Sequence, residues 1–180
     1  MGQPTTFIGI DVSKDTLDAC LLAPGGATRQ ASFPNDARGH AALLAWADRD
    51  LLESIPGVGR QTAATVLAEL PPVDRLPSAE SAAAYAGLAP REFRSGASVR
   101  RRTRLSKAGN ARLRKALFLP AQTAVRFNPL LKEFFARLVG AGKPKMQAVG
   151  ACMRKLVMLC YGVLKNRAPF DPAWASKKAA

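Results

Sequence analysis

Two glycines in an otherwise helical stretch place the strongest constraint on how this chain folds. Residues 51–70 read LLESIPGVGRQTAATVLAEL, so helix-forming segments flank Pro56-Gly57-Val58-Gly59. Glycine permits a sharp turn and a close approach of the backbone to a ligand, and the next helix begins with unpaired N–H groups. The segment therefore predicts two short helices in a helix-hairpin-helix, with Gly57, Gly59 and Arg60 near a DNA phosphate. The alternative is a helix-helix connection that only packs.

The charge of the chain is unevenly distributed. Its net charge is +14; residues 1–50 and 51–90 each net −2, whereas residues 91–115 and 116–180 each net +9. This pattern favours a polyanionic partner, with nucleic acid ahead of a membrane surface because no long apolar amphipathic face accompanies the basic cluster. Charge alone does not separate DNA from RNA.

The basic side chains are densest over residues 100–115. Consecutive arginines without acidic partners repel one another, and contacts with phosphates would relieve that repulsion. The segment from Lys107 to Asn110 also leads into a helix start that suits a further phosphate. The predicted contact residues here are Arg100, Arg101, Arg102, Arg104, Lys107, Asn110 and Arg112, with Arg114 and Lys115 beside them.

Other chemistries have little support in the composition. We find no signal-peptide pattern and no run of about 18 uncharged apolar residues, so we expect no membrane association. The three cysteines lack CxxC spacing and His40 is the single histidine, which disfavours zinc sites and Ser-His or Cys-His catalysis. We expect reduced, structural thiols in a cytoplasmic protein.

The periodicity predicts an α+β fold. Apolar, strand-length runs at 7–12, 16–23 and 27–33 precede a helix capped by Asn35 or Asp36, which completes a short β-β-β-α unit over residues 1–50. Three strands and one helix bury little surface, so this unit alone would be marginal. A mainly helical domain is expected over 51–170 and a flexible tail over 171–180. Within the helical domain, further helices are predicted at 78–86, capped by Ser78, and at 110–127, 129–139 and 144–165, with a loop at 87–98.

Four segments follow one another in a characteristic order: GIDVSKDTLDACL, IPGVGRQTAATVLAEL, AYAGLAPREFRSG and SVRRRTRLSKAGNARLRKALF. Together they resemble the IS110 family of bacterial insertion-sequence transposases. The resemblance implies an N-terminal RuvC-type, RNase H-like nuclease domain and a C-terminal transposase domain with a catalytic serine. It also implies a structured guide RNA and Mg²⁺.

The resemblance places the first nuclease carboxylate on Asp11, at the end of the first strand. A metal-dependent nuclease needs several carboxylates around its divalent ions, and the family's later Glu and pair of Asp residues have no counterpart here. This implies an internal deletion and leaves the Mg²⁺ site incomplete. A solvated carboxylate at a strand end is an equally good reading of Asp11.

The family's nucleophilic serine falls on Ser95. A serine recombinase attacks the DNA phosphate and holds the strand as a phosphoseryl link. Guanidinium groups such as that of Arg94 would stabilise charge on the phosphate in the transition state. Without the resemblance, a serine before glycine is usually a turn residue.

Two functions therefore stay open. The first is a DNA transposition or recombination protein, shortened and defective in cutting, that binds DNA and a guide RNA. We expect its incomplete sheet to self-associate into a homo-oligomer through an exposed edge. The second is a small DNA-binding or regulatory protein without catalysis. The missing carboxylates favour binding without cutting in either case.

Overall fold

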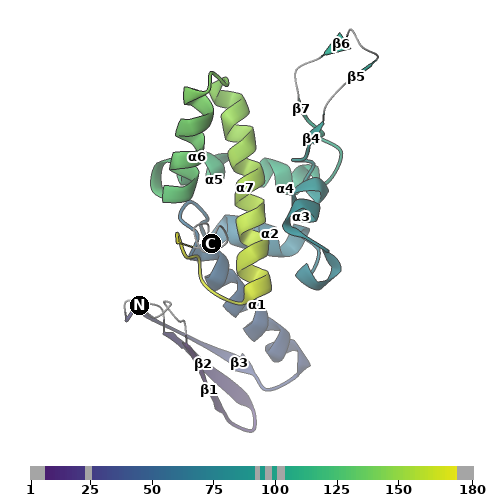
Figure 1. Ribbon diagram of the computed structural model, residues 1–180. Coiled ribbons are helices and arrows are strands. Elements are labelled where there is room, and N and C mark those ends of the chain that lie inside the picture. Colours follow the sequence, from purple (N-terminus) through teal and green to yellow (C-terminus); the bar gives the residue numbers. More distant parts are fainter. Residues whose placement is uncertain (1–6, 23–25, 92–93, 96–98, 101–103, 174–180) are drawn as a thin grey trace.

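A three-stranded antiparallel sheet precedes a group of helices in the computed structural model (Figure 1). The structure describes residues 7–22, 26–91, 94–95, 99–100 and 104–173, and only the backbone of 94–95, 99–100 and 104. The strands β1 (Phe7–Val12), β2 (Thr16–Leu22) and β3 (Thr28–Pro34) follow one another in that order across the sheet. The predicted α+β class and the three predicted strands are confirmed.

One face of the sheet is only partly covered. Leu17, Ala19 and Leu21 of β2 are buried on this face. The register pairs them with Val12, Ile10 and Ile8 of β1, so these apolar side chains share the face. Nevertheless β1 is exposed along its whole length, and Ile10 is 47% exposed. The sheet therefore ends in an uncovered apolar edge strand.

Helix α1 (Ala37–Glu53) packs against β3, at the edge of the sheet opposite β1. Asp36 caps it, because its carboxylate accepts a hydrogen bond from Gly39 N at 2.7 Å, which confirms one of the two predicted caps. The Trp46 ring meets Phe33 of β3 edge-on, with the ring centroids 6.0 Å apart. At its other end, Leu52 is fully buried in the helical core. A single helix thus packs on the sheet and also joins the helical core at its last turn.

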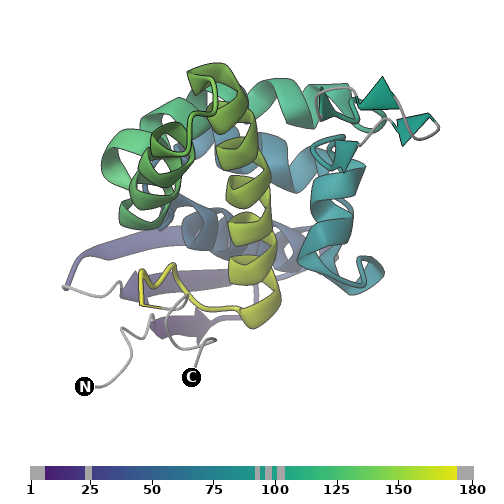
Figure 2. The ribbon, with the colours of Figure 1, turned by 45° about the horizontal axis from the view of Figure 1, so that its top comes forward.

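Helix α7 (Lys145–Asn166) runs between α5 (Phe118–Phe127) and α6 (Pro129–Gly140) on one side and α3 (Ala79–Tyr85) on the other (Figures 1 and 2). Leu156, Val157 and Cys160 of α7 are fully buried, in a core that extends from Leu52 to Leu164. The elements are α2 (Arg60–Glu69), the 3-10 turn η1 (Val73–Arg75), α3 (Ala79–Tyr85), α4 (Ala111–Ala116), α5 (Phe118–Phe127), α6 (Pro129–Gly140) and α7 (Lys145–Asn166).

The single helix predicted over 110–127 is wrong, because the structure divides it at Leu117 into α4 and α5. Pro120 has no N–H group, so the carbonyl of Ala116 has no donor four residues later. The other helices lie close to where the sequence predicts them. Ser78 caps α3, as expected, by accepting a hydrogen bond from Ser81 N.

Helix α7 is long and apolar enough to cross a membrane by length and composition, a property that the sequence analysis did not anticipate. However, 67% of its most apolar window is buried inside the molecule, so packing in the core accounts for its composition. Burial raises the pKa of the Cys152 thiol to about 11 and that of Cys160 to about 12. Both cysteines are free thiols in this core helix.

Candidate nucleic-acid interface

The two glycines of the predicted hairpin have different surroundings. Gly57 adopts φ +103°, and a Cβ added to it would lie 2.7 Å from the Ala124 backbone in α5. Gly59 is exposed, and a Cβ there would meet nothing within 4 Å. Gly57 therefore allows the turn to pack against α5, while Gly59 faces outward. The helix before the hairpin is the 17-residue α1 rather than the short helix that the sequence predicts.

Helix α2 begins directly at this hairpin. Gly59 occupies its N-cap position without a side-chain hydrogen bond, and the Gly59 carbonyl accepts from Ala63 N at 2.9 Å. The N–H groups of the first turn precede that bond and have no partner within the helix. Arg60 is exposed at the same end. The start of α2 thus combines open amides with a cation, both of which suit an anion.

The four short strands described between residues 90 and 105 project from the helices and are named here the arm (Figures 1 and 2). Strand β4 (Pro90–Arg91) pairs with β7 (Arg104–Leu105), and β5 (Arg94–Ser95) pairs with β6 (Val99–Arg100). The sequence predicts a loop at 87–98 and basic helices after it, so these strands are a correction. Strands of two residues are too short for an alternating pattern, which is why periodicity missed them.

The pairing in the arm places arginines opposite arginines. Arg91 lies opposite Arg104, and Arg94 lies opposite Arg100. Like charges at directly opposite positions destabilise a strand pair. An anion bound at the arm would offset this repulsion.

The chain after the arm is fixed to the end of α3. Ser106 N donates to Ala89 O at 2.9 Å, and Lys107 N donates to Gly87 O at 3.0 Å. Lys107 has φ +57° and is exposed. The Leu105 side chain lies against Gly150 of α7, which anchors the last strand of the arm to the core.

Asn110 fixes the start of α4 from within the fold. Its side-chain oxygen accepts from Leu113 N at 3.0 Å, and its amide donates to the Glu69 carboxylate at 2.8 Å. Arg112 reaches the same carboxylate at 3.4 Å, although its side chain is 85% exposed. The structure therefore gives Asn110 a structural role and leaves most of Arg112 open to a partner.

The predicted serine site is described only in part. The backbone of Ser95 lies in β5, opposite Val99 and next to Arg94. Arg101 and Arg102 lie outside the described residues, as do the side chains of Arg94, Ser95, Arg100 and Arg104.

Asp11 lies in β1 opposite Asp18 of β2, on the face away from the buried side chains. Within the described residues, no group of three or more His, Cys, Asp or Glu side chains is placed to hold a metal ion. Glu53 and Glu69 are engaged elsewhere, with Arg29 and Asn110 respectively. The described residues therefore do not supply the carboxylate set that a Mg²⁺-dependent nuclease requires.

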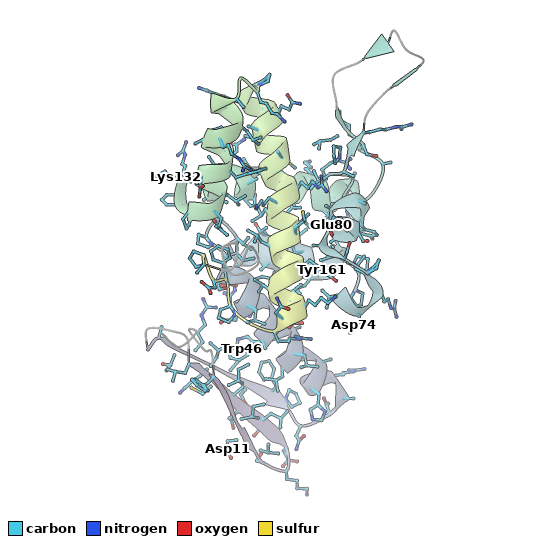
Figure 3. All side chains as sticks on the ribbon, in the orientation of Figure 1. Asp11, Trp46, Asp74, Glu80, Lys132 and Tyr161 are labelled. Carbon is cyan, nitrogen blue, oxygen red and sulfur yellow. The ribbon has the colours of Figure 1, made fainter. Side chains whose placement is uncertain are left out.

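Sequence reasoning missed a cleft at the junction of sheet and helices. It has a volume of about 470 Å³ and is lined by Arg29 and Gln30 of β3, Trp46, Arg49 and Glu53 of α1, and Arg60 of α2. Figure 3 labels Trp46 at this junction. Trp46, Arg49 and Glu53 recur at helical spacing, but the cleft also depends on β3 and α2, which periodicity does not bring together.

Together the helical core, the outward helix start and the arginine-bearing arm define a basic protein suited to a polyanion. Residues 49–136 match the family model of the IS116/IS110/IS902 transposases, so the chain belongs to this family. Over 123 residues the chain is 39% identical to a pilin gene-inverting protein of Moraxella bovis. The aligned part covers 67% of this chain and 38% of that relative. The chain is 31% identical over 131 residues to an uncharacterised protein of insertion element IS110 from Streptomyces coelicolor, covering 73% of this chain and 32% of that protein.

Proposed function

We propose that this chain is the nucleic-acid-binding part of an insertion-sequence recombinase, and that the arm and the start of α4 contact DNA and a guide RNA. The observation that carries this proposal is that Arg94 lies directly opposite Arg100 on the projecting arm. These residues belong to a segment that nets +9. Phosphates offset such repulsion and release counterions on binding.

The hairpin adds a second contact to this proposal. Its exposed Gly59, the open first turn of α2 and Arg60 would hold a phosphate of the same duplex. A helix-hairpin-helix is the motif that this geometry supports. Gly57 contributes indirectly, because its close packing on α5 fixes the turn.

Ser95 is the proposed nucleophile of the recombinase. Its Oγ would attack a DNA phosphorus and displace a deoxyribose oxygen, which takes up the hydroxyl proton. The phosphoseryl link conserves the phosphodiester for rejoining. The relatives support the reaction class, since one is named as a pilin gene-inverting protein and another as an insertion-element protein.

We further propose that the chain binds without completing strand exchange by itself. Asp11 faces Asp18, and the described residues assemble no third carboxylate with them. The missing carboxylates support an internal deletion within the RNase H-like unit that the resemblance implies. The same observation favours the second candidate function, a regulatory protein that occupies DNA without cutting it.

Self-association through β1 is also part of the proposal. Antiparallel pairing of two β1 strands with Ile10 opposite Ile10 would place Ile8 opposite Val12. Asp11 would then face Gly9, and no like charges would meet. The described part of β1 carries no proline or lysine, the residues that commonly protect edge strands.

Mobility-shift titrations of one duplex at several salt concentrations test the binding proposal. Replacing Arg100, Arg101 and Arg102 by alanine should weaken binding and flatten the slope of log K against log salt by about 0.9 for each lost phosphate contact. The matched control replaces the exposed Lys132, Lys143 and Lys145 by alanine, which removes the same charge elsewhere. Equal slopes in the two triple variants would exclude the arm as the contact surface.

A further inference from the structure

The cleft between sheet and helices carries more positive charge than its own ion pairs neutralise. Arg29 is held by Asp50 and Glu53, with Arg29 Nη1 3.1 Å from Glu53 Oε2. Arg49 Nε lies 3.8 Å from Glu53 Oε1, beyond hydrogen-bond distance. Arg60 is exposed and forms no ion pair within the described part of the chain. Two arginines with free donors therefore border the cleft together with the start of α2.

Trp46 supplies an aromatic surface in the same cleft. Its ring is partly buried and meets Phe33 edge-on, at an interplanar angle of 60°. Contact with Phe33 holds the indole in place against β3, while the cleft leaves part of it accessible. Fixed, partly exposed aromatic rings are the platforms on which unpaired bases stack.

One buried polar atom beside the cleft, Glu53 Oε1, has the Arg49 ion pair at 3.8 Å but accepts no hydrogen bond from the described residues. The other oxygen of the same carboxylate, Oε2, accepts hydrogen bonds from Arg29. A buried acceptor without a donor is costly, so such atoms are usually satisfied by a ligand or a water.

We propose that this cleft binds an unpaired nucleotide of a nucleic-acid strand. The base stacks on Trp46, and the phosphate lies between Arg49 and Arg60 beside the open start of α2. A base within a duplex stays stacked on its neighbours and does not reach the indole, so the site selects single strands. The inference rests on the proposed nucleic-acid function and extends it to unpaired segments.

The direction of α2 supports a strand rather than a free nucleotide. Its ten residues span about 15 Å, from Arg60 at the cleft to Glu69, whose carboxylate contacts Asn110 and Arg112. A strand leaving the cleft along α2 would therefore reach the basic start of α4 and the arm within a few nucleotides. The cleft and the basic start of α4 thus lie at opposite ends of α2.

Fluorescence of Trp46 tests this inference directly. In a Trp174→Phe background, Trp46 is the single tryptophan, and single-stranded oligothymidylate should quench it in a saturable way. A duplex of equal length should quench it less. Deoxythymidine monophosphate should quench Trp46 only at a much higher concentration than the strand. If the monophosphate saturates the quenching at a concentration similar to that of the strand, the cleft is a free-nucleotide site and the proposal is contradicted.

Affinity measured by the anisotropy of labelled oligothymidylate gives the second readout. Trp46→Leu should weaken single-strand binding by about 5- to 100-fold because the stacking contact is lost, whereas Trp46→Phe should retain most of it. Arg49→Gln should also weaken single-strand binding, because it removes a phosphate contact. Lys132→Gln on α6, far from the cleft in Figure 3, is the matched control. Unchanged single-strand affinity in folded Arg49→Gln and Trp46→Leu variants would overturn the inference.

Duplex binding separates the two proposals. Trp46→Leu should leave duplex affinity and its salt slope unchanged, since the arm carries that contact. If duplex binding fails while single strands still quench Trp46, the arm proposal falls and the cleft stands. If duplex binding persists and no strand quenches Trp46, the cleft proposal falls alone.

Discussion

At the scale of single residues, the chain uses chemically similar positions for different purposes. Gly57 and Gly59 look equivalent in the sequence, yet only Gly57 has a positive φ and backbone contact with α5. Asn110 likewise resembles a phosphate ligand at a helix start, but the fold engages both ends of its amide. Sequence shows which residue types are present; the tertiary partners, Ala124 and Glu69, decide what each one does.

The glycine pair gives a prediction at this scale. Gly57→Ala should cost at least about 2 kcal/mol in the free energy of unfolding, because the new Cβ adds positive-φ strain and overlaps Ala124. Gly59→Ala should cost about 1 kcal/mol or less, since its surroundings are open and only the N-cap preference changes. Urea denaturation measures both values. Equal losses would contradict the different roles assigned to the two glycines.

At the scale of elements, local signals predicted most of the helices and all three strands of the main sheet. Asp36 and Ser78 cap helices as their side-chain chemistry predicts. The break between α4 and α5 and the strand pairs of the arm were missed. Pro120 lies inside a strongly apolar helical pattern that masks it, and the arm strands have only two residues each, too few for an alternating pattern.

The sheet and α7 should differ in local stability. Edge strand β1 is exposed throughout, whereas α7 contributes many of the buried side chains of the core. Amide exchange in residues 7–12 should therefore be much faster than in residues 150–164 of the monomer. Equal protection of the two segments in a monomer would contradict the view of the sheet as an incomplete unit.

Protection of β1 should rise with protein concentration if two copies pair through this strand. Ile10→Lys should abolish that rise, because the substitution places two ammonium groups opposite each other in the proposed pairing. Sedimentation velocity on the same samples reports the oligomeric state. A concentration-dependent dimer that persists in Ile10→Lys would mean that another surface mediates association.

At the scale of the whole molecule, α1 joins parts that the sequence treats as separate. The helix runs through residue 50, where composition suggests a boundary, and its carboxylates bind Arg29 of β3 and Arg167 after α7. These pairs connect positions 21 and 119 residues apart, so no local pattern predicts them. The cleft exists because of this joining, which is why its residues were not foreseen.

One experiment tests the central claim that the chain binds recombination DNA without cutting it. Labelled DNA carrying the ends of the insertion element is incubated with the chain, Mg²⁺ and RNA transcribed from the flanking element sequence. The mixture is then divided between native and denaturing gels. We expect a salt-sensitive shift on the native gel and no covalent protein-DNA adduct on the denaturing gel. An adduct that disappears in Ser95→Ala would show an active recombinase, and the absence of any shift would refute nucleic-acid binding itself.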